Sequence, residues 1–145
     1  MASRIIGIDF GLRRIGLALS DESKILATPL ETYLIENKME KSVANLMSHL
    51  LEHSKSHYYT IEMIVVGMPY MMNGSHGHLA DEVDHFVTLL KNHTEIPIVT
   101  WDERLSSVQA DRSLREANLS RKKRKQHVDK VAATLILQSY LDSRC

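Results

Sequence analysis

The chain has 145 residues, of which 43% are apolar. This length and composition predict one globular domain, 1–145, with a sizeable core. No apolar run approaches the roughly 20 residues of a membrane span, and the first residues lack the pattern of a signal peptide. Cys145 is the only cysteine, so an internal disulfide is excluded and a reducing, cytoplasmic setting is predicted.

The formal net charge of zero conceals an uneven distribution along the chain. Residues 1–103 carry 8 Lys/Arg against 14 Asp/Glu, whereas residues 104–145 carry 10 against 4. A basic tail on an acidic domain favours an anionic partner such as nucleic acid, and the alternative is a solvated charged face.

Apolar patterning predicts the secondary structure in chain order. Strands are expected at 5–9, 15–20, 26–34, 61–67 and 97–101, and helices at 39–51, 79–90, 106–117 and 128–141. Short connections join the first three strands, and helices separate the later ones. This order predicts an α/β fold with a five-stranded mixed sheet flanked by helices on both faces.

Asp9 ends the first strand, which is otherwise apolar. A charge at such a position is costly to bury unless a partner or ligand compensates it. Gly7 and Gly11 flank Asp9 and leave room for a ligand or a close backbone. The alternative is an aspartate whose side chain caps the following hairpin turn.

Asp102, Glu103 and Arg104 follow the fifth strand. Ligands collect at the carboxyl ends of parallel strands, so two acids and a phosphate-binding guanidinium are expected at such a mouth. Side chains alternate along a strand, so only one of the two acids need face Asp9. The alternative for the acids is a helix start, and Arg104 could either stabilise charge on a phosphate or hold the turn.

Asp129 is expected to open the last helix on its apolar face. It precedes an apolar stripe formed by Ala132, Ala133, Ile136 and Tyr140. The two alanines would let the helix approach the sheet closely and bring the carboxylate to the other acids. The alternative is an acid stabilised by the helix dipole.

Carboxylates from three separate elements suit a site for Mg²⁺ or Mn²⁺, because hard cations prefer oxygen ligands. Two such ions can activate water and stabilise the leaving oxygen of a phosphodiester. The loop histidines His76 and His78 are interpreted as surface residues. Trp101 is interpreted as a core residue, and the alternative is that it stacks on a base.

Five consecutive cations, Arg121, Lys122, Lys123, Arg124 and Lys125, stand shortly before Asp129. Such a cluster neutralises backbone phosphates without sequence preference. Its position beside a candidate catalytic acid favours substrate binding over a solvated loop.

Four blocks of the sequence resemble the YqgF/RuvX family of Holliday-junction-resolvase-like proteins. The blocks are Ile8-Asp9-Phe10-Gly11 with Arg13-Arg14-Ile15-Gly16, Val65-Val66-Gly67-Met68-Pro69 with Asn73-Gly74, Asp102-Glu103-Arg104-Leu105-Ser106, and Lys122 to Lys125 with Asp129 and Ala132-Ala133. His78 departs from the proline and Asn73 from the aspartate that the family often has at these positions.

The resemblance implies a ribonuclease H-like fold and a nuclease that processes the 5′ end of precursor 16S ribosomal RNA. It further implies that Asp9, Glu103 and Asp129 are the catalytic, metal-binding acids. The expected partners are precursor rRNA or branched DNA, bound by a monomer or homodimer with no membrane contact. The alternatives are a branched-DNA resolvase, a non-catalytic ribosome-assembly factor and, more remotely, a sugar-kinase-like ATPase.

Overall fold

The computed structural model describes residues 1–71, 73–106 and 121–144, with the backbone alone for 121–131. Its five strands form one sheet in the order β3-β2-β1-β4-β5. The three N-terminal strands, β1 (Ala2–Phe10), β2 (Arg14–Ser20) and β3 (Ala27–Leu34), form an antiparallel meander. The remaining strands, β4 (Tyr59–Met68) and β5 (Ile98–Asp102), continue the sheet in parallel with β1. The predicted five-stranded mixed sheet is therefore confirmed.

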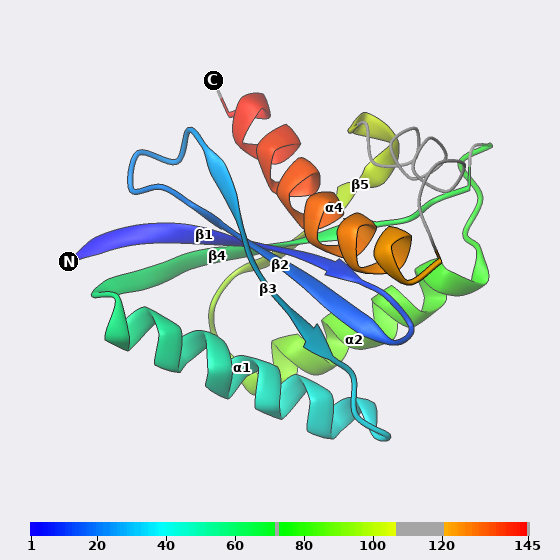
Figure 1. Ribbon diagram of the computed structural model, residues 1–145, viewed down its shortest axis with the longest axis horizontal. Helices are drawn as coiled ribbons and strands as arrows, with labels where there is room; N and C mark the ends of the chain where they lie inside the picture. Colours follow the sequence, from blue (N-terminus) through cyan, green and yellow to red (C-terminus); the bar gives the residue numbers. More distant parts are fainter. Residues whose placement is uncertain (72, 107–120, 145) are drawn as a thin grey trace.

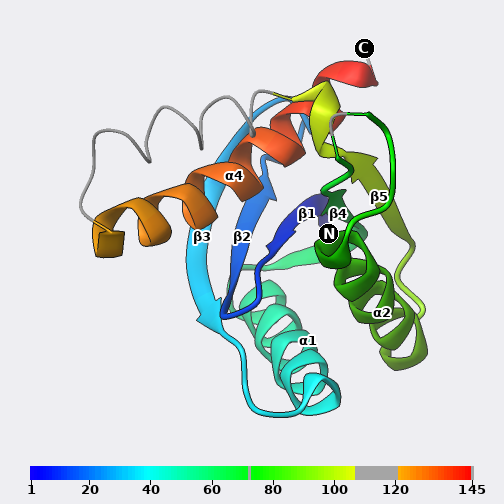
Figure 2. The same ribbon diagram turned by 90° about the vertical axis from the view of Figure 1, so that its right-hand side faces the viewer.

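Helices cover both faces of this sheet, as Figure 2 shows. Helices α1 (Met39–Ser56) and α2 (His78–His93) lie on one face, and α4 (Arg121–Ser143) crosses the other (Figure 1). Alternate residues of β1 serve the two layers: Ile6 and Ile8 join the core beneath α1 and α2, whereas Ile5 joins the core beneath α4. The side of a strand on which a residue lies thus decides which helix layer it meets.

Two glycines let α4 lie close to the middle of the sheet. A Cβ on Gly7 of β1 would be 2.7 Å from Cβ of Leu137, and one on Gly67 of β4 would be 2.4 Å from Cδ1 of Ile136. Any side chain at these two positions would push the helix away. The expectation that Gly7 permits a close backbone approach is confirmed.

The last helix differs from the prediction at its start. It begins at Arg121 rather than near Val128, so the basic run is helical and is not a loop. Asp129 consequently lies in the third turn and does not open the helix, so the helix dipole of a first turn does not explain it. Lys, Arg and Gln are good helix formers, which accounts for the longer helix.

Most of the helix predicted at 106–117 lies outside the described residues. Before it, Glu103–Leu105 forms a short 3-10 helix, η1. None of the described helices is long and apolar enough to cross a membrane.

Candidate active site

Asp9 lies on the α4 face of the sheet and is almost completely buried, with 1% of its surface exposed. It shares this face with Ile5 and Gly7, because side chains alternate along β1. Its antiparallel partner on β2 is Gly16, which has no side chain to fill the space beside it. Asp9 is a strand residue, and the turn that follows is closed by Gly11, whose N–H donates to Arg14 O at 2.8 Å.

The carboxylate of Glu103 lies over the neighbouring strand, β4. Glu103 is the first residue of η1 and is 2% exposed, and its Oε2 lies 3.1 Å from the point that a Cβ of Gly67 would occupy. The parallel register pairs Ile8 with Val66, so Asp9 and Gly67 are the next neighbours, about 4.8 Å apart across the sheet. Two buried acids from different elements therefore meet beneath α4, at the carboxyl ends of β1 and β5.

Asp102, the other acid of the pair, has a structural role. Its Oδ1 accepts a hydrogen bond from the Arg104 backbone N–H at 2.9 Å, and its carboxylate binds the Arg104 guanidinium through Nε at 3.1 Å and Nη2 at 2.7 Å. The hydrogen bonds from the Arg104 side chain lower the pKa of Asp102. Asp102 thus caps the start of the 3-10 helix, which leaves Glu103 as the acid that faces Asp9.

Arg104 is engaged in holding this turn. Besides its bonds to Asp102, its guanidinium carbon lies 5.4 Å from the centre of the Tyr70 ring, in the loop that follows β4. Of the two roles predicted for Arg104, these contacts support the positioning role. Binding of nucleic acid by Arg104 stays a prediction.

Position 129 lies on the same side of the sheet as Asp9. The carbonyl oxygen of Ala133, one helical turn later, lies 3.2 Å from the point that a Cβ of Gly7 would occupy. Ala132, Ala133 and Ile136 are buried as predicted, and so are Leu137 and Leu141, which the predicted stripe did not include. The side chain of Asp129 is outside the described part of the chain, so its place in the triad stays a prediction.

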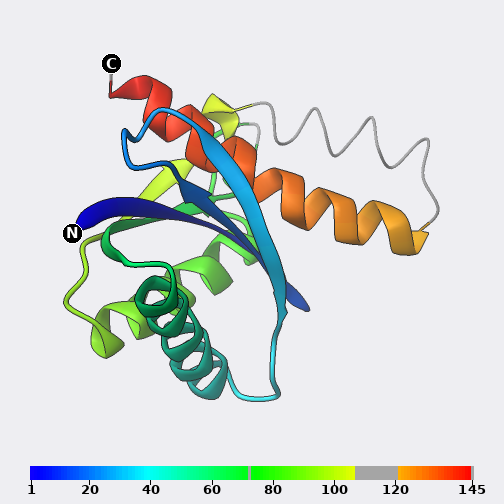
Figure 3. The ribbon, with the colours of Figure 1, turned by 60° about the vertical axis from the view of Figure 1, so that its left-hand side comes forward.

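The first turns of α4 carry the basic run, Arg121 to Lys125. Figures 1 and 3 place this end of the helix at the end of the sheet where β1 finishes and turns into β2. The cationic segment and the buried acids therefore occupy the same end of the molecule.

A second group of candidate metal ligands includes neither Asp9 nor Glu103. His76, Asp81 and Asp84 are exposed, and their ligand atoms lie within 4.8 Å of one another. Nε2 of His76 is 2.6 Å from Oδ2 of Asp84, at the start of α2. His76 and His78 are both exposed, as predicted.

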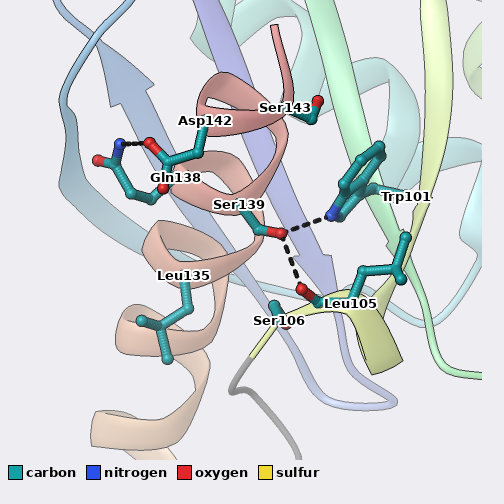
Figure 4. A pocket seen from close by; sticks show the side chains of 8 residues that line it. All are labelled: Trp101, Leu105, Ser106, Leu135, Gln138, Ser139, Asp142 and Ser143. Carbon is teal, nitrogen blue, oxygen red and sulfur yellow. Dashed lines mark hydrogen bonds between the residues drawn. The ribbon is translucent and has the colours of Figure 1, made fainter. Parts of the chain in front are cut away.

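A groove of about 620 Å³ lies between η1 and the C-terminal half of α4 (Figure 4). Trp101 lines it and donates a hydrogen bond from Nε1 to Ser139 Oγ at 2.9 Å. Its ring also packs edge-on against Tyr140, with ring centres 5.5 Å apart. Trp101 is thus anchored in the partly buried layer under α4, as a core residue. Neither Asp9 nor Glu103 lines this groove.

Sequence reasoning did not identify Gly67 as part of the site. Sequence patterns give it only as a strand end and as part of a family block, yet the absence of its side chain admits the Glu103 carboxylate. A glycine that follows the apolar run 63–66 of a strand is itself a signal of close approach.

This architecture is that of a ribonuclease H-like domain, and resolvases of known structure share it. One is RuvC of T. thermophilus in complex with a Holliday junction substrate, with a TM-score of 0.55, 15% sequence identity, and coverage of 98% of this chain and 95% of RuvC. Another is the fowlpox virus Holliday junction resolvase, with a TM-score of 0.52, 11% identity, and coverage of 97% and 99%.

The chain belongs to the RuvX family, described as Holliday junction resolvase, whose sequence pattern matches residues 3–143. A protein of Protochlamydia amoebophila is 57% identical over 99% of this chain and 95% of its own length. One of Clostridium novyi is 45% identical over 97% and 98% of the two chains. Both carry the name "Putative pre-16S rRNA nuclease". Family membership favours the nuclease interpretation over the sugar-kinase-like alternative.

Proposed function

We propose that this protein is a metal-dependent nuclease that hydrolyses phosphodiester bonds in the 5′ region of precursor 16S ribosomal RNA, in the cytoplasm. The observation that carries the proposal is the meeting of two buried carboxylates beneath α4, Asp9 at the end of β1 and Glu103 at the start of η1. Buried acids that converge in this way are costly unless a cation or strong donors compensate them.

The residues present fit Mg²⁺ or Mn²⁺. Both side chains offer carboxylate oxygens, the ligands these ions prefer. Gly67 has no side chain, which lets the Glu103 carboxylate lie over β4, and Gly16 opposite Asp9 has none either. We propose that Asp9, Glu103 and Asp129 hold the ion, with Asp129 supplied from the third turn of α4.

A divalent cation held by these residues would supply a coordinated water of lowered pKa and charge stabilisation for the phosphate. The protein's own part is positioning. The hydrogen bond that Asp102 Oδ1 accepts from the Arg104 backbone N–H holds the turn that carries Glu103, while the sheet fixes Asp9. We propose that the basic run on α4 binds the backbone phosphates of the substrate.

The choice of precursor 16S rRNA rests on the names of the two relatives. Branched DNA is the second candidate substrate, because the family description names Holliday junctions. A ribosome-assembly factor without catalytic activity is the third alternative, and it predicts nucleic-acid binding without cleavage.

The deciding experiment incubates the purified protein with a 5′-labelled precursor 16S rRNA fragment and a labelled four-way DNA junction, with Mg²⁺ or with EDTA. We expect Mg²⁺-dependent cleavage of the RNA, and loss of cleavage in Asp9→Asn and Glu103→Gln. Asp102→Asn is the matched control, because it neutralises the adjacent acid that does not face Asp9. Cleavage that persists in Asp9→Asn and Glu103→Gln would contradict the proposed site.

Cleavage of the junction alone would support the resolvase, and binding without cleavage of either probe would support the assembly factor. Light scattering of the protein–RNA complex decides between monomer and homodimer.

A further inference from the structure

Arg14, the first residue of β2, faces the same side of the sheet as Asp9. Ile15 and Leu17 of β2 belong to the core beneath α1 and α2, whereas Ala18 belongs to the core beneath α4. Side-chain alternation therefore places Arg14 and Gly16 on the α4 face. Gly16 stands opposite Asp9, so Arg14 is the diagonal neighbour of Asp9 across the β1–β2 pair. Diagonal neighbours lie about 7–8 Å apart, within reach of a long side chain.

The guanidinium of Arg14 is held in an unfavourable position. Within the part of the chain that the structure describes, its Nη1 is buried and donates no hydrogen bond. The residue as a whole is only partly buried, so part of its surface reaches solvent. A charged donor removed from water without an acceptor costs free energy. An anion that accepted hydrogen bonds from this guanidinium would recover that cost.

We propose that Arg14 binds a backbone phosphate of the nucleic-acid substrate next to the phosphodiester held at Asp9. This inference rests on the proposed nuclease function and adds a binding residue to the same site. Guanidinium groups match phosphate oxygens with two parallel hydrogen bonds, which ammonium groups cannot do. The β1–β2 turn and the basic start of α4 lie at the same end of the sheet (Figure 3), so Arg14 would hold the strand between the acids and the basic run.

The test compares Arg14→Gln, Arg14→Lys and Arg13→Gln. Arg13 is the neighbouring exposed arginine and has the same charge, so it controls for a general electrostatic effect. The probe is a labelled single-stranded RNA of 20 nucleotides in EDTA, which keeps binding separate from cleavage. Isotherms at several salt concentrations give affinity and salt dependence, and urea unfolding of each variant gives stability.

Arg14→Gln should weaken RNA binding about tenfold, the loss expected for one charge-assisted hydrogen-bonded contact. The log–log salt slope should fall by about 0.7, the value for one phosphate contact on a single strand. Arg14→Lys should lose less affinity because it keeps the charge, and Arg13→Gln should change affinity less than Arg14→Gln. Stability of Arg14→Gln should be unchanged or higher, because the substitution removes a buried donor that has no acceptor.

Equal affinity in wild type and Arg14→Gln, or equal losses in Arg13→Gln and Arg14→Gln, would overturn the proposal. A clear loss of stability in Arg14→Gln without a change of salt slope would assign Arg14 a purely structural role and would overturn it as well. Because binding is measured without metal, a wild-type protein that binds the RNA but cleaves nothing in Mg²⁺ would refute the nuclease while leaving the Arg14 result valid.

Discussion

The Glu103 carboxylate lies in the space that a side chain at Gly67 would need: its Oε2 atom is 3.1 Å from the point where a Cβ of Gly67 would stand. Ile136 of α4 fills the other side of that space, with Cδ1 at 2.4 Å from the same point. One missing side chain on β4 thus determines both how closely α4 packs and where the acid lies. Stability and the candidate site are coupled at this position.

Gly67→Ala should destabilise the protein by about 1–3 kcal/mol, because the added methyl overpacks a core without free space. It should also weaken Mg²⁺ binding by displacing the Glu103 carboxylate. Urea unfolding and calorimetric Mg²⁺ titration measure the two effects.

Ile136→Val removes the Cδ1 methyl group and supplies the matched second variant. The double variant Gly67→Ala/Ile136→Val should recover part of the lost stability and none of the Mg²⁺ affinity, because Glu103 still meets the new methyl. If the stability loss of the double variant equals the sum of the losses in the two single variants, the two side chains do not compete for this space.

Asp102→Asn should reduce stability at neutral pH and leave Mg²⁺ affinity nearly unchanged. Hydrogen bonds from Arg104 lower the pKa of Asp102 in the folded protein below that of the unfolded chain, which is about 3.9. A lowered folded pKa gives stability that is present above the unfolded pKa and is lost as the pH falls through the folded value. The difference in unfolding free energy between wild type and Asp102→Asn should therefore shrink below about pH 4.

Urea unfolding at pH 7 and pH 3 measures this difference. A double-mutant cycle with Arg104→Gln isolates the contribution of the pair. A gap between wild type and Asp102→Asn that is the same at both pH values would exclude a contribution from ionised Asp102.

Gln138 joins α4 to the turn between β2 and β3. Its Nε2 donates to Ile25 O at 2.8 Å, and its Oε1 accepts from Ala27 N at 2.9 Å. Gln138→Met keeps the shape but removes both bonds, together with the bond from Nε2 to Asp142 Oδ1 at 2.9 Å, and should cost about 1 kcal/mol of stability. Amide exchange at Ala27 should accelerate, and Mg²⁺ affinity should not change.

Gln138→Glu serves as the control, because it can still accept from Ala27 N but cannot donate to Ile25 O. It should fall between wild type and Gln138→Met in amide protection at Ala27. Unchanged exchange at Ala27 in Gln138→Met would mean that the turn does not depend on this side chain.

The strand order and the two helix layers could be predicted because they rest on local apolar patterns. The continuous apolar run of β1, for example, predicts a strand covered on both faces. The end of that run also identifies Asp9 as a residue at a strand end. The face of the sheet on which Asp9 lies, however, depends on which helix covers Ile5 and which covers Ile6. That choice is a tertiary property, and the sequence pattern does not contain it.

The roles of Asp102 and Glu103 could not be separated by composition or spacing, since both acids follow the same strand. The separation comes from the backbone of η1, which directs Asp102 to Arg104 and Glu103 to Gly67. The start of α4 was predicted too late because the basic run has no apolar periodicity, although its residues favour helix. Apolar periodicity shows where a helix packs, whereas the extension beyond the packed part depends on propensity alone.

The helical basic run predicts how the protein binds nucleic acid. Replacing Lys122, Lys123, Arg124 and Lys125 with alanine should weaken binding to a similar extent for unrelated RNA sequences, because phosphate contacts carry no base information. Each lost contact should lower the log–log salt slope by about 0.7 to 0.9. Alanine is the strongest helix former, so α4 should persist in the variant, and circular dichroism checks this.

The matched control removes four exposed lysines from the opposite helix layer, Lys38, Lys41, Lys55 and Lys91. Both quadruple variants change the net charge equally, so a difference between them reports position and not total charge. A salt slope that falls only in the α4 variant would place the phosphate backbone along the first turns of that helix. Equal slopes in the two variants would show that the run contributes only to the overall field of the protein, and the substrate path from the buried acids to α4 would have to be abandoned.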